Sequence, residues 1–129
     1  MIADDNNRMR QTLKVLIASM ENAVVLGEAH NGEDAITLAN KLLPDIILMD
    51  INMSPVNGFE ATRKILRQNP ATRIIGLSLH QQPSYAKNML KIGACGYVTK
   101  SASHLEIIEA IRTVAAGGKY IDKEIRGSL

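Results

Sequence analysis

The chain has 129 residues, of which 46% are hydrophobic and 22% are charged, and its formal net charge is +2 at pH 7. These values predict one folded domain and exclude a disordered or fibrous protein, and the scattered cationic residues argue against nucleic-acid binding by this chain. A single cysteine excludes an internal disulfide and a cysteine-rich metal site. We find no signal peptide and no long apolar run, and we therefore expect a soluble cytoplasmic protein with no membrane partner.

The chain begins with three apolar residues, 1–3, which predict a short first strand. Asp4 and Asp5 follow this strand directly, where a polar residue can also cap the next helix. Two adjacent carboxylates at the end of a buried strand repel each other, and such pairs are usually tolerated because a cation lies between them. Apolar residues at helical spacing then predict a helix between Arg8 and Met20.

Residues 24–29 predict a second strand, and a helix that begins at Asn31 and ends before Pro44 follows it. The next stretch, residues 46–49, is a continuous apolar run of the kind expected for a strand covered on both faces. This run ends on Asp50, which therefore lies where a buried parallel strand emerges and where open α/β sheets place their chemistry. A lone aspartate at this point would instead be interpreted as a turn or helix cap.

The second half of the chain continues the alternation of helices and strands. The predicted elements are a helix over residues 59–68, a strand over 73–78, a helix over 83–92, a strand over 96–100 and a helix that starts at the capping-box spacing Ser103 to Glu106. The two strands end on Ser78 and Lys100. Residues 119–129 are expected to form a short tail.

Five strands that alternate with five helices predict an α/β fold without an interior linker. We expect a flavodoxin-like, doubly wound parallel sheet of five strands in the order 2-1-3-4-5, which places the ends of the first and third strands side by side. Asp4, Asp5 and Asp50 would then converge at one edge of the sheet. Ser78 and Lys100 would lie at the ends of the neighbouring strands.

Three carboxylates, a hydroxyl and a lysine at one sheet edge form a specific combination. Hard oxygen ligands without His or Cys select Mg²⁺ or Mn²⁺ over zinc, and magnesium keeps positions for phosphate oxygens. A carboxylate beside such a cation can attack a phosphoryl group and form an aspartyl phosphate. Lys100 would neutralise one phosphoryl oxygen, and Ser78 would donate a hydrogen bond to another.

With these residues the sequence resembles the receiver domain of two-component response regulators, and the resemblance covers residues 1–129 as one receiver domain. The matching motifs are the acidic pair, Asp50 with Gly58 eight positions on, Ser78 at the end of the fourth strand, and GYVTK, in which Tyr97 precedes Lys100 by three residues. Each motif is weak alone, but all of them in order at the family's spacing are specific.

The resemblance implies that Asp50 is the phosphoacceptor and takes a phosphoryl group from a phosphohistidine of a sensor kinase. Asp5, Asp50, the backbone carbonyl of Asn52 and, through water, Asp4 would hold the Mg²⁺ or Mn²⁺ cofactor. Such a domain is a signalling switch and not a turnover enzyme.

The resemblance also implies that Ser78 and Tyr97 form a switch pair, in which the hydroxyl moves toward the phosphoryl group and the ring turns inward behind it. Lys100 would hold a phosphoryl oxygen. The surface formed by the last two strands and the last two helices would then change its partners. An aromatic residue in a strand is usually a core residue, so this role of Tyr97 rests on the resemblance alone.

Two positions depart from the common family pattern. Ser54, followed by Pro55, stands where the family often has proline, and Lys100-Ser101 replaces the frequent Lys-Pro. The second departure and the ending AAGGKYIDKEI resemble the NarL and FixJ (LuxR-type) subclass, whose receivers usually lead into a helix-turn-helix DNA-binding domain. We therefore expect control of transcription through a domain that this chain lacks, contact with DNA only through that domain, and homodimers on activation.

Three other interpretations remain open. A stand-alone or degenerate receiver would act through protein contacts only. A haloacid-dehalogenase-type Mg²⁺ phosphatase combines similar residues, but it needs a second acid two residues after the nucleophile, where this chain has Asn52. A flavodoxin-like cofactor binder would need a phosphate loop rich in Gly, Ser and Thr where this chain has Asp4 and Asp5.

Overall fold

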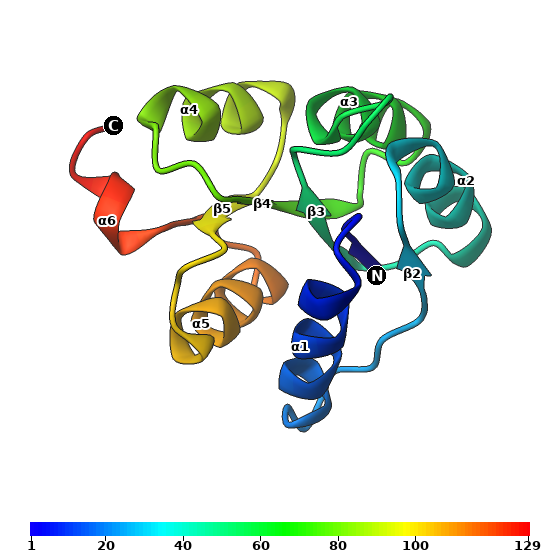
Figure 1. Ribbon diagram of the computed structural model, residues 1–129, viewed down its shortest axis with the longest axis horizontal. Coiled ribbons are helices and arrows are strands. Elements are labelled where there is room, and N and C mark those ends of the chain that lie inside the picture. The colour runs from blue at the N-terminus through cyan, green and yellow to red at the C-terminus, as the bar shows by residue number, and fades with distance from the viewer.

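The computed structural model describes residues 1–129, and its centre is a six-stranded parallel sheet in the order β2-β1-β3-β4-β5-β6 (Figure 1). The strands are β1 (Ile2–Ala3), β2 (Glu28–Ala29), β3 (Ile46–Asp50), β4 (Arg73–Ser78), β5 (Gly96–Thr99) and β6 (Tyr120–Ile121). The helices are α1 (Asn7–Ala18), α2 (Gly32–Leu42), α3 (Gly58–Gln68), α4 (Pro83–Ile92), α5 (His104–Ala115) and α6 (Lys123–Arg126). The expected order 2-1-3-4-5 is confirmed, with β6 added beyond β5.

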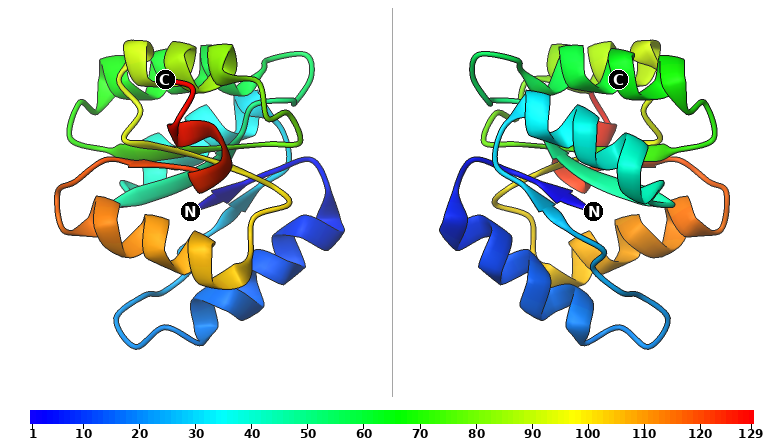
Figure 2. Two further views of the ribbon diagram at one scale, coloured as in Figure 1. Left: turned by 90° about the vertical axis from the view of Figure 1, so that its left-hand side faces the viewer. Right: turned by 90° about the vertical axis from the view of Figure 1, so that its right-hand side faces the viewer.

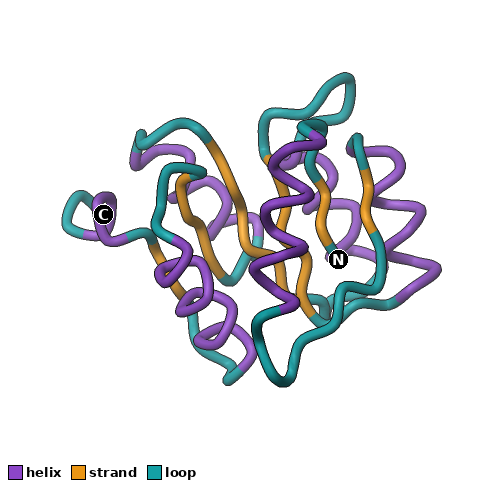
Figure 3. Tube along the Cα trace, turned by 60° about the horizontal axis from the view of Figure 1, so that its bottom comes forward, coloured by secondary structure: helices purple, strands orange, loops and turns teal.

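Helices cover both faces of this sheet. α2, α3 and α4 lie on one face and α1 and α5 on the other, as the views from the two sides show (Figure 2). A view along a third direction shows the strands side by side between these helices (Figure 3). No helix has the length and apolar character that a membrane span requires.

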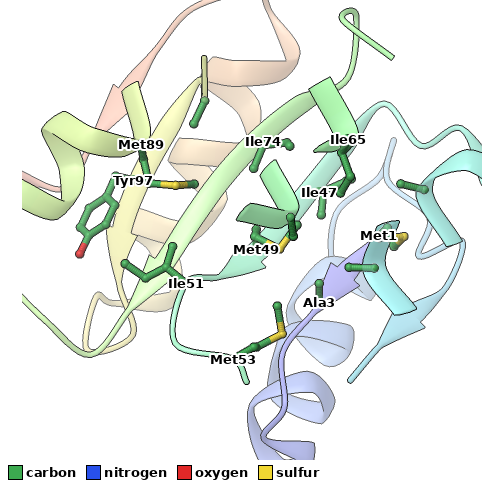
Figure 4. Close-up of a cluster of buried hydrophobic side chains, with 14 of the residues drawn as sticks. Met1, Ala3, Ile47, Met49, Ile51, Met53, Ile65, Ile74, Met89 and Tyr97 are labelled. Carbon is green, nitrogen blue, oxygen red and sulfur yellow. The ribbon is translucent and has the colours of Figure 1, made fainter. Parts of the chain in front are cut away.

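A hydrophobic cluster fills the space on each side of the sheet. In β3, Ile47 and Met49 face the cluster under α2, α3 and α4, whereas Leu48 between them faces the cluster under α1 and α5. This alternation explains why the third strand is a continuous apolar run, because both of its faces are buried. Figure 4 shows the first cluster, with Tyr97 toward one end and Met1 toward the other.

Side-chain caps fix the starts of α1, α2, α3 and α5, and a fifth side-chain cap, Asp122, precedes α6. The pairs of cap oxygen and backbone N–H in the first four are Asn6 with Met9, Asn31 with Asp34, Asn57 with Glu60 and Ser103 with Glu106. The predicted capping box is only half formed. The Glu106 carboxylate does not bond back to Ser103 but accepts hydrogen bonds from the Tyr120 hydroxyl at 2.9 Å and the Lys123 N–H at 2.8 Å.

The second strand is shorter than expected. Only Glu28 and Ala29 pair with β1, whereas Val24 and Leu26 are 80% and 53% exposed. The apolar character of residues 24–29 therefore does not reflect burial along the whole stretch.

The expected short tail over residues 119–129 does not end the sheet at β5, because this segment forms β6 and α6. The Tyr120 N–H donates to the Cys95 carbonyl at 3.0 Å, and the Asp122 N–H donates to the Tyr97 carbonyl at 2.8 Å. Ile125 of α6 is buried in the same cluster as Tyr97. Main-chain pairing and the buried side chains of Tyr120 and Ile125 thus hold the segment along the edge of β5.

Candidate functional site

Asp4 and Asp50 lie side by side because their strands pair. Ala3 of β1 is opposite Met49 of β3, so the residue after each of them emerges at the same edge of the sheet. Both carboxylates are buried, and Asp5 next to them is exposed. Carboxylate oxygens of these three residues all lie within 4.8 Å of one another. The structure thus brings together the three acidic residues expected from the sequence.

Lys100 reaches this group of carboxylates from the end of β5. Its Nζ lies 2.8 Å from Asp4 Oδ2 and 3.3 Å from Asp50 Oδ2. Apart from these ion pairs, both Oδ2 atoms are buried without a hydrogen-bond partner. Lys100 therefore pairs with two of the three carboxylates, and no ion pair includes Asp5.

The environment shifts the pKa values of two of these groups. Burial raises the pKa of Asp50 to about 6, and the charge of Asp4 adds to this shift. The Asn52 N–H, which donates to Asp50 Oδ1 at 2.9 Å, and the Lys100 ammonium oppose it. Burial alone would lower the pKa of Lys100, but its contacts with Asp4 and Asp50 outweigh burial and raise it.

Ser78, the last residue of β4, connects two loops around the site. Its Oγ donates to Asn52 Oδ1 at 3.0 Å and accepts from the His80 N–H at 3.0 Å. The side chain of Asn52 thus joins the loop after β3 to the end of β4. Sequence reasoning assigned only the backbone carbonyl of Asn52 to the site, because the side-chain contact spans 26 positions of the chain.

Tyr97 of β5 lies beneath the loop that follows Ser78. Its ring is fully buried, and its hydroxyl donates to the His80 carbonyl at 2.8 Å. Burial raises the pKa of Tyr97, with further contributions from Tyr85 and Asp122 and an opposing one from Ser78. Tyr97 is therefore both a core residue and a hydrogen-bond partner of the loop next to the site.

Gly58 allows α3 to begin against the end of β3. A Cβ at this position would lie 2.4 Å from the Asp50 carbonyl oxygen and 2.5 Å from Ile51 Cα. Any side chain here would therefore require a shift of the backbone. The Gly58 N–H donates to the Ile51 carbonyl at 3.2 Å. The glycine eight positions after Asp50 therefore closes the loop around the site, in which the bond between Ser54 and Pro55 is cis.

This fold and this group of side chains define a class of protein. The chain matches the response regulator receiver domain family over residues 1–112 and belongs to this family of phosphorylation-controlled signalling switches. It is 40% identical over 128 residues to the transcriptional regulatory protein DegU of Brevibacillus brevis. The matched region covers 99% of this chain and 54% of DegU. It is 36% identical over 129 residues to the response regulator GacA of Pseudomonas aeruginosa, and the matched region covers 100% of this chain and 60% of GacA.

A solved structure agrees with this assignment. The LuxR-family two-component response regulator from Aurantimonas sp. SI85-9A1 has a TM-score of 0.95 and 33% identity, over 98% of this chain and 91% of that chain. The resemblance to the LuxR-type subclass is thus confirmed. The chain spans 54% to 60% of the length of DegU and GacA.

Proposed function

We propose that Asp50 accepts a phosphoryl group from a phosphohistidine of a sensor kinase and that this event switches the domain between two signalling states in the cytoplasm. The observation that carries the proposal is the cluster of Asp4, Asp5 and Asp50 at the edge of the sheet, with Lys100 paired to two of them. Burial favours the chemistry, because charges and hydrogen bonds act more strongly where water is excluded.

The residues of this cluster fit a divalent cation. Apart from Lys100, the buried Oδ2 atoms of Asp4 and Asp50 have no partner, and the donor set consists of oxygen atoms, which suit Mg²⁺ or Mn²⁺. Asp5, Asp50 and the Asn52 backbone carbonyl would hold the ion, with Asp4 bound through water. When bound, the ion would neutralise charge on the phosphoryl oxygens and orient the group for transfer.

The transfer forms one bond and breaks one. A carboxylate oxygen of Asp50 attacks the phosphorus, the phosphorus–nitrogen bond of the phosphohistidine breaks, and an aspartyl phosphate results. Lys100 would hold one phosphoryl oxygen, and Ser78 would exchange its bond to Asn52 for one to another phosphoryl oxygen. The unphosphorylated histidine of the kinase is the leaving group, and the phosphoryl group stays on Asp50, so the domain acts as a phosphoacceptor and not as a turnover enzyme.

The contacts of Ser78 suggest how the change spreads. Ser78 Oγ accepts from the His80 N–H, and the His80 carbonyl accepts from the Tyr97 hydroxyl. A movement of Ser78 toward the phosphoryl group would pull on this loop and alter the surface formed by α4, β5 and α5, or a dimer surface. Since DegU is named a transcriptional regulatory protein, we propose that the output is transcription through a DNA-binding domain in a longer protein.

Intact mass after incubation with acetyl phosphate and Mg²⁺ tests the phosphoacceptor. We expect a gain of about 80 Da, the mass of one phosphoryl group, which EDTA prevents and the substitution Asp50→Asn abolishes. Asp5→Asn should slow the gain in mass but leave the phosphoacceptor, Asp50, in place. A gain of the same size in Asp50→Asn would place the phosphoryl group elsewhere and refute the assignment. If the wild type gains no mass, phosphotransfer from a sensor kinase is the deciding measurement.

A further inference from the structure

Asp122 is a buried carboxylate that the phosphoacceptor chemistry does not use. It lies between β6 and α6 and is 1% exposed. None of the ion pairs in the structure includes it. Because a buried charge without a counter-ion is costly unless hydrogen bonds satisfy it, the partners of Asp122 indicate what the carboxylate does.

Only one oxygen of Asp122 caps α6. Oδ1 accepts from the Glu124 N–H at 2.9 Å, which is the ordinary contact of a helix cap. Oδ2 accepts instead from Thr99, from its N–H at 2.9 Å and from its Oγ1 at 3.1 Å. A neutral residue could form the cap alone. The second oxygen therefore binds Thr99 at the end of β5, 23 positions earlier in the chain.

Thr99 directly precedes Lys100, and the end of β5 is held from both sides. On the β4 side, the Lys100 N–H donates to the Ser78 carbonyl at 2.7 Å. On the other side β6 pairs only as far as Tyr97, so the N–H of Thr99 has no strand partner and bonds to Asp122. A lysine side chain is flexible, so the position of its backbone decides where the ammonium group can reach.

We propose that Asp122 is a positioning residue for Lys100, because it fixes the end of β5 and couples the docking of residues 120–126 to phosphoryl binding at Asp50. This inference rests on the proposed function of Lys100. Coupling is reciprocal, so a ligand that engages Lys100 also stabilises the contact between Asp122 and Thr99. The segment beyond α5, which lies beside β5 (Figure 1), thus senses the occupancy of the site through its main-chain contacts with β5 and the contact of Asp122 with Thr99.

Glu106 provides a matched control. Its carboxylate anchors the same segment through Tyr120 and Lys123 but forms no bond to β5. Glu106→Gln therefore weakens the attachment of the segment to α5 and leaves Thr99 in place, whereas Asp122→Asn weakens the bonds to Thr99 itself. Main-chain pairing of Tyr120 and Asp122 with β5 remains in both variants.

The test is calorimetric titration of beryllofluoride, a phosphoryl analogue, at saturating Mg²⁺, together with Mg²⁺ affinity alone and thermal unfolding. In Asp122→Asn we expect beryllofluoride to bind roughly fivefold more weakly or worse, with Mg²⁺ affinity unchanged because Asp4, Asp5 and Asp50 are not displaced. In Glu106→Gln both affinities should equal those of the wild type even if the melting temperature falls. In the wild type, beryllofluoride should slow hydrogen exchange of the Thr99 and Asp122 amides.

Each other result has a defined meaning. If a folded Asp122→Asn variant binds beryllofluoride as tightly as the wild type, Asp122 acts only as a helix cap and the inference is overturned. An equal loss in Glu106→Gln would also overturn it, because docking of the segment in general would then control the site. If Asp122→Asn does not fold, Thr99→Val, which removes one of the two bonds, must show a smaller loss of beryllofluoride affinity. Failure of the wild type to bind beryllofluoride would overturn the proposed function itself.

Discussion

At the scale of single residues, backbone contacts fix the functional side chains. The Asn52 N–H holds one oxygen of Asp50, and the Asn6 N–H holds Asp4 Oδ1 at 2.8 Å. These two bonds leave the Oδ2 atoms of both carboxylates facing Lys100. The site is therefore organised before any ligand binds, which lowers the cost of reorganisation during transfer.

Gly58→Ala should destabilise the protein by about 2–3 kcal/mol, because the new methyl group would collide with backbone atoms of Asp50 and Ile51 that cannot rotate away. Urea unfolding followed by circular dichroism measures this. Gly127→Ala is the matched control, since a Cβ there meets nothing within 4 Å, and its effect should stay within about 0.5 kcal/mol. Equal stabilities of the two variants would contradict this role of Gly58.

The convergence of Asp4, Asp5, Asp50 and Lys100 at one sheet edge could be predicted from sequence because each follows or ends a predicted strand, and the strand order then brings them together. The side-chain role of Asn52 and the bonds of Asp122 could not. Both depend on contacts between segments that are far apart in the chain, and no local pattern encodes such a contact.

At the scale of elements, β6 and α6 show where pattern reading fails. A strand of two residues and a helix of four are too short for an apolar period to be recognised. The opposite error occurred at residues 24–29, where an apolar run predicted pairing that only its last two residues make. The long elements were predictable because each combines a clear period with a cap or a breaker.

Tyr120 should make the attachment of β6 sensitive to alkaline pH. Burial, and then the hydrogen bond to Glu106, raise the pKa of Tyr120 from 10.0 to about 12. A raised pKa means that the folded state favours the neutral phenol, so this contribution to stability is complete below pH 10 and is lost as the pH rises through about 12. Urea unfolding over this range should show a smaller loss of stability in Tyr120→Phe than in the wild type. Parallel curves for the two proteins would refute this.

At the scale of the whole molecule, the clustered carboxylates should limit stability when no metal is bound. Asp50→Asn removes one of the two buried carboxylates of the cluster, which pair with a single lysine. Without Mg²⁺ we expect this substitution to raise the free energy of unfolding by roughly 1–2 kcal/mol. With Mg²⁺ at a hundred times its dissociation constant, the wild type should gain about 2.7 kcal/mol, and the variant should gain less.

Thermal unfolding of both proteins with Mg²⁺ and with EDTA measures this difference. The substitution Asp45→Asn, at an exposed residue outside the cluster, is the control and should leave the response to Mg²⁺ unchanged. An equal response of Asp50→Asn and the wild type to Mg²⁺ would mean that Asp50 does not contribute to the metal site.

The pairing of β6 with β5 also determines where the domain can be shortened safely. The family match ends at residue 112, inside α5, so a protein cut there would lack the whole segment that lines β5. Such a protein would present the open N–H and carbonyl groups of β5 and an uncovered apolar site where Ile125 had packed. Exposed strand edges pair with other chains, so the shortened protein would be prone to aggregation, whereas a boundary beyond Arg126 keeps the edge closed.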